Sequence, residues 1–290
     1  MKVVFHFDGT DALRAKLGDV ILCPESDTAA FERLLPEMEV LWHVLKPVTA
    51  EVIARAPKLK LIQKIGSGVN TIDVEAAKKR GIAVCNLPGT NSRAVAEMTL
   101  LLMLACLRRL PQLREPDAWR LQDHFGELGG RTVGLLGYGA VPKILHPILE
   151  AMGAAVLYWS RSRRNAELND LLGRSDIVSL HLPLTPDTQQ SIDPRRMKRG
   201  SILVNTARGG LVNEDYLYDA LKSGHLAAAG LDVFATEPLP QGHRLLSLSN
   251  VLATPHLAWL TGETLQRSIA AARENVERLS AGIALLNRVA

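Results

Sequence analysis

The chain has 290 residues, a length that suits two domains of ordinary size. Hydrophobic residues make up 47% of the chain and aromatic residues only 4%, so its core must be aliphatic. The formal net charge of +4 is small and evenly spread, which argues against nucleic acid or a membrane surface as a partner and is compatible with small anions. Three distant cysteines and eight histidines without ligand spacing argue against a disulfide framework and against a metal site.

The chain begins with a short apolar run that reaches an acid at Asp8, which indicates a first strand and not a signal peptide. Its longest apolar stretch, residues 98–107, is too short to cross a bilayer. Together with the unpaired cysteines, which indicate a reducing compartment, these features predict a cytoplasmic protein.

Short aliphatic runs alternate with amphipathic segments in the first third of the chain. Thr49 is a plausible N-cap for one of these helices, because an acid follows it closely at Glu51. The alternation predicts βαβ units around a parallel sheet. The expected strands are 2–7, 19–23, 39–42, 61–65 and 82–85, and helices are expected at 49–56 and 73–80.

A long, nearly all-apolar helix is expected at 92–110, and such a helix is usually buried on most sides. A second βα series follows it, so the sequence predicts an α/β protein with two Rossmann-like parallel-sheet domains that this helix joins. The expected strands of the second series are 131–136, 154–159, 177–180, 201–204, 227–231 and 251–253, and an amphipathic helix at 262–279 comes last.

A glycine-rich turn connects strand 131–136 to the next helix. Gly137 permits a tight turn, and Gly139 lets the backbone approach a pyrophosphate at the helix N-terminus. Pro142 replaces the third glycine of the GxGxxG pattern, which leaves the helix–strand packing open. The turn predicts dinucleotide binding, with a plain tight turn as the alternative. The expected cofactor-binding residues here are Gly137, Tyr138, Gly139, Ala140 and Val141.

The end of strand 154–159 carries the residues expected to select the cofactor. An NAD site would place an acid here to bind the ribose 2′-hydroxyl, but this chain has Ser160 and Arg161. A hydroxyl and a guanidinium suit a 2′-phosphate better. We therefore expect NADP(H) to be favoured, with NAD(H) possible. The alternative is a solvated basic helix start.

Three further blocks resemble the signature motifs of the D-isomer-specific 2-hydroxyacid dehydrogenases. They are Asn205-Thr206-Ala207-Arg208-Gly209-Gly210, Gly230-Leu231-Asp232-Val233-Phe234-Ala235-Thr236-Glu237-Pro238 and Thr254-Pro255-His256-Leu257-Ala258-Trp259. Segments 66–73, 88–92 and 181–185 resemble the substrate loop, the hinge helix and a cofactor-side loop of that family. The resemblance covers the chain from about Leu59 onward. It implies hydride transfer between a nicotinamide cofactor and a 2-keto or 2-hydroxy acid.

Chemistry and position agree on three catalytic candidates. Arg208, Glu237 and His256 each follow a predicted strand, and the carboxyl ends of parallel strands are where α/β active sites lie. The fork of Arg208 suits a substrate carboxylate. His256 can supply the proton for the carbonyl oxygen, and Glu237 beside it would keep it protonated at neutral pH. Each residue alone could equally be an ordinary surface side chain.

The resemblance implies roles for further residues. It places Asp232 at the nicotinamide carboxamide. For Asp232 and for the residues named next, the competing interpretations are strand-end packing and plain turns. The implied cofactor contacts are His181, Pro183, Thr206, Ala207 and Asp232, and the implied substrate-binding set is Ser67, Gly68, Val69 and Arg208.

The family pattern also predicts the domain layout. Residues 1–92 and 262–290 would form a discontinuous, flavodoxin-like substrate domain, and residues 93–261 the dinucleotide-binding domain. The substrate would lie in the cleft between them, and the protein would be a homodimer joined through the dinucleotide-binding domain. Asn70 and Met98 depart from residues often found in the family, an Asp and a His.

Within the family, the block at 254–259 and the basic run at 160–163 most resemble glyoxylate and hydroxypyruvate reductases. Two alternatives stay open. One is a redox-sensing scaffold that binds a dinucleotide with little turnover, and the other is a dehydrogenase of the same fold for another small anion, such as formate or phosphite.

Overall fold

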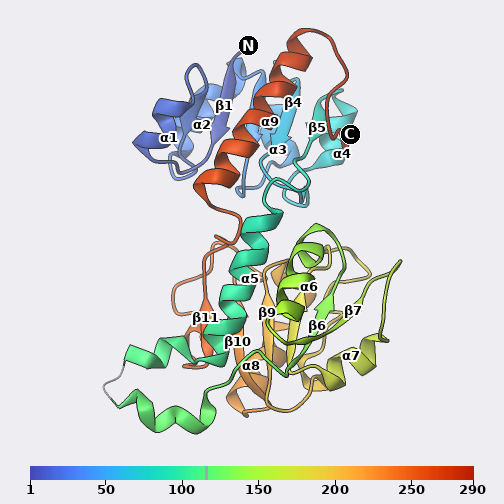
Figure 1. The fold of residues 1–290 in the computed structure, drawn as a ribbon. Helices are drawn as coiled ribbons and strands as arrows, with labels where there is room; N and C mark the ends of the chain where they lie inside the picture. Colours follow the sequence, from blue (N-terminus) through green and yellow to red (C-terminus); the bar gives the residue numbers. More distant parts are fainter. Residues whose placement is uncertain (115–116) are drawn as a thin grey trace. The chain divides into compact units, whose positions relative to one another are not determined.

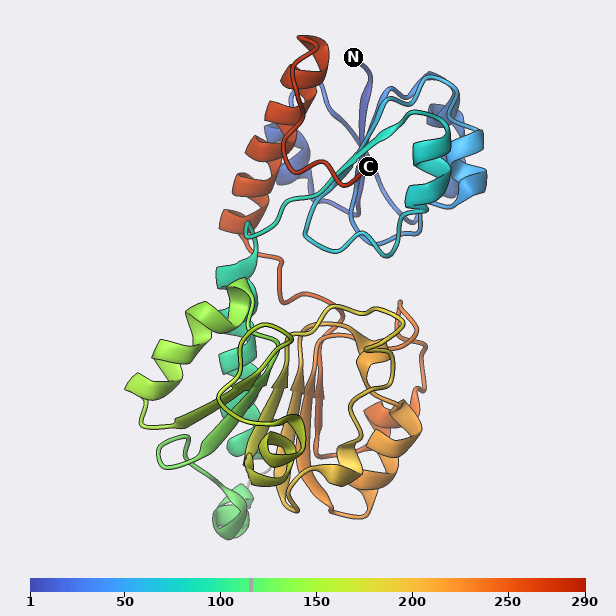
Figure 2. The ribbon, with the colours of Figure 1, turned by 90° about the vertical axis from the view of Figure 1, so that its right-hand side faces the viewer.

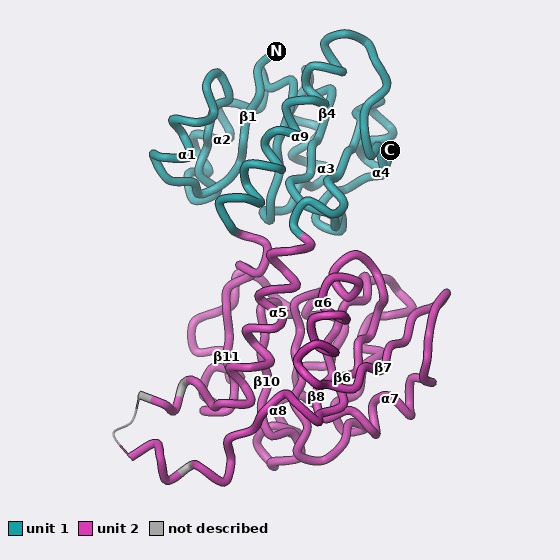
Figure 3. The backbone as a smooth tube through the Cα atoms, in the orientation of Figure 1, with its two compact units in different colours: residues 1–91, 261–290 teal, residues 92–260 magenta. Residues whose placement is uncertain are grey.

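The computed structural model describes residues 1–114 and 117–290 and divides the chain into two compact units. Unit 1 comprises Met1–Asn91 and Thr261–Ala290, and unit 2 comprises Ser92–Leu260 (Figure 3). Each unit is built around its own parallel sheet, so the predicted fold class, α/β with two parallel-sheet domains, is confirmed. In the described residues no helix is both long and apolar enough to traverse a bilayer.

Unit 1 contains a five-stranded sheet in the order β2-β1-β3-β4-β5. This is the flavodoxin-like order, with its switch point between β1 and β3. Its strands are β1 (Val3–His6), β2 (Ile21–Cys23), β3 (Val40–His43), β4 (Leu61–Lys64) and β5 (Ala83–Cys85), and its helices are α1 (Asp11–Lys16), α2 (Thr28–Leu34), α3 (Ala50–Ala54), α4 (Val74–Lys79) and α9 (Gly262–Ser280) (Figure 1).

Helices cover both faces of this sheet. One face packs Val4, Leu41 and Ile62 against side chains of α2, α3 and α4. On the opposite face, α9 carries Asn275, whose side-chain amide donates to Gln63 Oε1 on β4 at 2.7 Å. Because α9 comes from the C-terminal end of the chain, unit 1 is assembled from two segments that are distant in sequence. The predicted N-cap at Thr49 is also present, with its hydroxyl accepting from Val52 N.

Three polar side chains occupy the last register row of the unit 1 sheet. His6, His43 and Lys64 pair across β1, β3 and β4, and all three are at least nine-tenths buried. The ring of His6 stacks on Phe31 at 3.8 Å. Burial lowers the pKa of His6 to about 4, with the Lys46 charge adding to the effect and Asp8 opposing it, and burial also holds the pKa of His43 well below its usual range.

We predict that acid destabilises the protein through His6. The folded pKa lies below the ordinary value of 6.5, so the unfolded chain takes up the proton first as the pH falls. Stability is therefore full above about pH 6.5 and declines toward about pH 4, by at most about 3 kcal/mol for this one group. Denaturant unfolding across this pH range measures the effect.

The variant for this test is His6→Phe, which keeps an aromatic ring on Phe31 but removes the titrating group. It should make the acid limb of the stability profile shallower without removing it, because buried His43 contributes in the same direction. The same change at the exposed His124 should leave the limb as in wild type. An acid limb that survives unchanged in His6→Phe would contradict the prediction.

Unit 2 contains a six-stranded sheet in the order β11-β10-β9-β8-β6-β7. Its strand order reverses between β6 and β8, which makes the carboxyl ends of these two strands the switch point of a doubly wound sheet. The strands are β6 (Thr132–Leu136), β7 (Ala155–Trp159), β8 (Ile177–Leu180), β9 (Ser201–Asn205), β10 (Leu226–Leu231) and β11 (Val251–Ala253), and the helices are α5 (Ser92–Leu107), α6 (Ala140–Ala151), α7 (Leu168–Arg174) and α8 (Glu214–Lys222).

Two aliphatic layers sandwich this sheet. On one face, residues of α5 and α6 such as Met103 and Leu149 pack on β6 and β9. On the other face, residues of α7 and α8 such as Leu171 and Leu217 pack on the same strands. Figure 2 shows α5 and α6 on one side of the sheet and α8 on the other. The central strands β8 and β9 are thus buried along their whole length, whereas the edge strands β7 and β11 are only partly buried.

The long apolar helix is shorter than expected. We predicted a helix over 92–110, but α5 ends at Leu107, and a 3-10 helix, Leu110–Arg114, follows. Arg109 between them has a positive φ of 50°, which breaks the helical path. The helix is also not buried all round, since Leu101 is 53% exposed.

Candidate active site

The glycine-rich turn lies at the switch point of unit 2. Gly137 follows β6 with φ of 100°, and a Cβ on this residue would lie 2.5 Å from His181 O in the loop after β8. Only glycine fits there, because both the backbone conformation and the space exclude a side chain. The turn therefore joins the ends of β6 and β8 tightly and directs the chain into α6.

Gly139 differs from Gly137 because nothing in the protein crowds it. It is the N-cap residue of α6, and a Cβ on it would meet no atom within 4 Å. The open space lies at the N-terminus of this twelve-residue helix, where backbone N–H groups and the helix dipole favour an anion. Tyr138 lies in the same turn, and Ala140 and Val141 begin α6, so these residues fit the pyrophosphate of a dinucleotide.

Pro142 in place of the third glycine does not disturb this helix. It lies in the first turn of α6, where a missing N–H costs little, and its side chain is buried. Leu145 and Leu149 of the same helix are fully buried in the unit 2 core. The helix therefore packs closely on the sheet without the glycine.

The basic turn after β7 is internally ordered. Ser160 Oγ donates to Arg163 O at 2.7 Å and accepts from Arg163 N at 3.0 Å. Arg161 extends into solvent and pairs with Asp187 at 2.6 Å, with both side chains about three-quarters exposed. Arg163 lies over the rings of Tyr138 and Tyr158, at 5.1 and 5.7 Å. Three polar or basic residues thus gather beside the glycine-rich turn.

His181 and Pro183 follow β8 at the same edge of the sheet. His181 Nε2 lies 2.9 Å from Ser179 Oγ, and burial lowers the pKa of this histidine to about 3, so its ring is neutral. Pro183 is exposed, and its carbonyl accepts from Thr188 Oγ1 at 2.6 Å. Both residues lie where the switch point would present them to a ligand.

Arg208 lies in the turn after β9, and Asn205 shapes that turn. Asn205 Oδ1 accepts from Ala207 N, and its amide donates to Arg208 O at 2.9 Å. Gly209 then passes so close to Phe234 that a Cβ would lie 1.9 Å from its carbonyl carbon. Burial lowers the pKa of Arg208, and Glu237 opposes the shift. The turn thus brings a largely desolvated guanidinium close to the loop after β10.

His256 and Glu237 form a direct pair. His256 Nδ1 lies 2.7 Å from Glu237 Oε2, and the side chains are 20% and 29% exposed. Burial raises the pKa of Glu237, but the hydrogen bond and charge of His256, the amide of Phe234 and the Arg208 charge outweigh it and lower this pKa overall. Glu237 is therefore a carboxylate at neutral pH, and Nε2 is the ring nitrogen of His256 that this pair leaves for a substrate.

Asp232 fixes the loop that carries His256. Its Oδ1 accepts from Thr254 Oγ1 at 2.6 Å and Leu257 N at 2.8 Å, and its Oδ2 accepts from Ala258 N at 2.9 Å. Its backbone carbonyl also accepts from His256 N. This buried carboxylate thus stabilises His256 in a left-handed conformation with φ of 55°, which few non-glycine residues adopt.

Thr206 and Ala207, expected to line the nicotinamide pocket, lie between Arg208 and the end of β9. The hydroxyl of Thr206 is buried against that of Thr99 on α5 at 2.8 Å, so this side chain packs the helix onto the sheet. The backbone of Ala207 is held by Asn205. The sequence patterns gave no role to Asn205 or Thr254. Their positions, at the last residue of β9 and directly after β11, were a usable signal.

The expected substrate loop belongs to unit 1, whereas Arg208, Glu237 and His256 belong to unit 2. Ser67, Gly68 and Val69 follow β4. Ser67 O accepts from the side-chain amide of Asn86 at 2.7 Å, and Val69 O accepts from Ile72 N. The loop is thus anchored at both ends, with the amides of Gly68 and Val69 between them.

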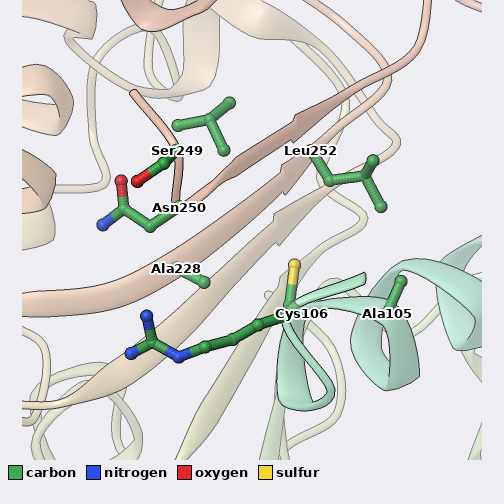
Figure 4. A pocket seen from close by; sticks show the side chains of 8 residues that line it. Ala105, Cys106, Ala228, Ser249, Asn250 and Leu252 are labelled. Atoms are coloured by element: carbon green, nitrogen blue, oxygen red, sulfur yellow. The ribbon is translucent and has the colours of Figure 1, made fainter. Parts of the chain in front are cut away.

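Unit 2 also contains a small pocket away from these residues. Across residues 1–114 and 117–290 no group of three or more His, Cys, Asp or Glu side chains could hold a metal ion. A pocket between α5 and β11, with Cys106, Ala228 and Leu252 in its wall, has a volume of about 10 Å³ (Figure 4). A cavity of that size holds one water at most.

Comparison with known proteins agrees with this geometry. Residues 100–258 match the family model described as D-isomer specific 2-hydroxyacid dehydrogenase, NAD binding domain. D-3-phosphoglycerate dehydrogenase of Mycobacterium tuberculosis is 40% identical over 290 residues, which cover 92% of this chain but 54% of that protein, so the chain spans about half the length of this relative. Glyoxylate reductase of Aeropyrum pernix is 36% identical over 93% of this chain and 89% of its own.

A solved structure is similar over the whole chain. NAD-dependent formate dehydrogenase from Staphylococcus aureus, in complex with NAD, has a TM-score of 0.89 and 26% identity over 100% of this chain and 99% of its own. The family model alone matches more than half of the chain, and it includes the glycine-rich turn and the residues around Arg208, Glu237 and His256. The resemblance inferred from the sequence motifs is thereby confirmed, and the chain belongs to the D-isomer specific 2-hydroxyacid dehydrogenase family.

Proposed function

We propose that the protein reduces small 2-keto acids, or oxidises the corresponding 2-hydroxy acids, with His256 as general acid and base. The observation that carries this proposal is the His256–Glu237 pair at 2.7 Å, at the same edge of the unit 2 sheet as Arg208. A protonated imidazole held by a carboxylate is suited to donate a proton to a carbonyl oxygen that gains negative charge.

Arg208 supplies the second requirement, an anchor for the substrate. Its guanidinium would hold the substrate carboxylate through paired N–H donors. Within unit 1, we propose that the backbone N–H groups of Ser67, Gly68 and Val69 bind an anionic group of the substrate. The nicotinamide cofactor supplies or accepts the hydride when it is bound. Glu237 holds the ring of His256 through Nδ1, and His256 passes a proton to the carbonyl oxygen in reduction and regains it in oxidation.

The cofactor would be held along the switch point of unit 2. Gly137 and Gly139 with α6 would bind its pyrophosphate, and His181, Pro183, Thr206, Ala207 and Asp232 would lie along the nicotinamide half. We propose that NADP(H) is preferred over NAD(H). The support is the cluster of Ser160, Arg161 and Arg163 where an acid would otherwise bind the ribose 2′-hydroxyl.

We predict that Arg161→Ala raises the KM for NADPH about tenfold or more and changes the KM for NADH by less than about twofold. Loss of a charge-assisted hydrogen bond to a phosphate is worth about 1.5–3 kcal/mol, and NADH carries no phosphate at this position. Initial rates with each cofactor at saturating keto acid measure both constants. Arg174→Ala, at an exposed arginine on α7, is the control. Equal losses for both cofactors would mean that the basic turn is not a phosphate site.

Substrate choice is tested with a panel of acids. Within the family we favour glyoxylate or hydroxypyruvate, because the 254–259 block resembles the reductases of these acids. The assay is loss of NADPH or NADH absorbance with glyoxylate, hydroxypyruvate, pyruvate and bulkier 2-keto acids. Oxidation of NADPH with at least one of them supports the proposal.

The same panel separates the alternatives. Formate and phosphite, tested with the oxidised cofactors, address a dehydrogenase of another small anion, a possibility to which the similar formate dehydrogenase gives weight. Dinucleotide binding without turnover of any acid would favour a redox-sensing scaffold instead.

We also propose that the protein is a homodimer joined through unit 2. Large apolar side chains are exposed on α5 and the two 3-10 helices that follow it, Leu110–Arg114 and Ala118–His124. Leu101 is 53% exposed and Trp119 66%, which is costly on a monomer. Sedimentation of the wild-type protein and of Leu101→Asp tests this, since the charge should shift a dimer toward monomer.

We place the reaction in a reducing compartment such as the cytoplasm. The support is that Cys23, Cys85 and Cys106 are all free and buried. Burial raises the pKa of Cys106 to about 12, so this thiol is inert as well as unpaired.

A further inference from the structure

A second carboxylate holds the loop on which Glu237 is carried. Glu214 lies in the first turn of α8, and its Oε1 accepts from the backbone N–H of Ala235 at 2.8 Å. Its Oε2 lies 3.4 Å from His243 Nε2, and the two side chains are only 18% and 19% exposed. Glu214 therefore connects α8 with both ends of the loop after β10.

This contact bears directly on Glu237. The neighbouring amide, Phe234 N, donates to Glu237 Oε1 at 3.0 Å, while Glu237 Oε2 contacts His256. Two successive amides of the loop thus donate to two different carboxylates, Phe234 to Glu237 and Ala235 to Glu214. The contact of Glu214 with Ala235 N therefore fixes the residue next to the amide that binds Glu237, and through it the orientation of the Glu237 side chain.

His243 completes the arrangement from the far end of the loop. Its ring packs edge-on against Phe234, with centroids 6.1 Å apart. Its Nδ1 is buried without a hydrogen-bond partner in the part of the chain that the structure describes, so Nε2 is the ring atom in polar contact, and Glu214 is what it faces. The loop is therefore pinned to one carboxylate at Ala235 and again at His243.

We propose that Glu214 is a positioning residue for the reaction: from α8 it fixes the 234–237 turn and thereby holds Glu237 against His256. The proposal rests on the proposed role of His256 as general acid and base. The other charged groups at the pair are Arg208, which faces Glu237, and Asp232, which faces His256. Neither contacts the amide of Ala235, so Glu214 is the carboxylate that controls this part of the turn.

Three variants test the proposal. Glu214→Ala removes both contacts, whereas Glu214→Gln keeps an oxygen that can accept from Ala235 N. Asp215→Asn is the matched control, because Asp215 lies in the same first turn of α8, contacts Arg244 in the same segment, and is 76% exposed. The Asp215→Asn variant therefore loses a comparable interaction with the helix dipole but leaves the contact with the Ala235 amide intact.

For Glu214→Ala we expect kcat for keto-acid reduction to fall about tenfold, within the roughly 100-fold that a 1 Å misplacement can cost. The KM for the keto acid should change little, since Arg208 is untouched. Glu214→Gln should recover most of the rate, and Asp215→Asn should match wild type.

Amide hydrogen exchange provides a readout that does not require turnover. Exchange of Ala235 N–H should be about tenfold faster in Glu214→Ala and near wild type in the other two variants. Unchanged exchange and an unchanged kcat in Glu214→Ala, or an equal loss in Asp215→Asn, would overturn the proposal. If wild type reduces no keto acid at all, the proposed function fails, and exchange at Ala235 alone then decides whether Glu214 holds the turn.

Discussion

Replacing His256 with alanine should lower kcat for keto-acid reduction by about 10³-fold, within the roughly 10²–10⁴-fold that a positioned general acid contributes. The imidazole pairs with Glu237 through Nδ1, so Nε2 is the atom left to donate the proton, and alanine provides no substitute. The dissociation constant for NADPH should change by less than about threefold, because the side chain is not part of the glycine-rich turn. Single-turnover rates and cofactor titration measure the two effects separately.

The pH dependence of the wild-type rate provides a second test of His256 as the proton donor. Reduction requires the protonated imidazole and should slow as the pH rises, whereas oxidation requires the neutral imidazole and should slow as the pH falls. Both limbs should disappear from the residual rate of His256→Ala. His124→Ala, at an exposed histidine of the same unit, is the control. A His256→Ala variant with the wild-type rate would exclude this residue as the proton donor.

The second large effect is expected at Arg208. Arg208→Ala should lower kcat/KM for the keto acid by about 10²–10³-fold, since truncating one partner of a buried, hydrogen-bonded charge pair costs about 2–5 kcal/mol. The loss should appear in both KM and kcat, because the carboxylate anchor also orients the carbonyl toward His256. Arg208→Lys should recover little, since an ammonium cannot reproduce the two-pronged contact.

A folded state must be verified before this loss is assigned to the substrate. Arg208 is largely desolvated, and its turn is held by Asn205 through backbone contacts that alanine retains. Thermal unfolding of Arg208→Ala should therefore stay close to that of wild type, and cofactor binding should persist. If KM and kcat for the keto acid were unaffected in a folded variant, the carboxylate would have to be bound elsewhere.

The sequence by itself determined the fold class and the set of residues at the sheet edge. Alternating βα segments predict parallel sheets, and in a parallel sheet every strand delivers its carboxyl end to one edge. For that reason the side chains just after β9, β10 and β11 could be grouped as Arg208, Glu237 and His256 without coordinates. The glycine-rich turn was equally readable, because the tight turn after β6 imposes its requirement locally.

Only the tertiary structure decided how those residues are held. Asp232 supports the His256 loop through donors 22 to 26 residues further along the chain, and Glu214 reaches an amide 21 residues away. Such contacts depend on which strand ends and helix starts come together in three dimensions, and no local pattern encodes them. The end of α5 at Leu107 was likewise visible only in the structure, where Arg109 adopts a positive φ and leaves the helical path.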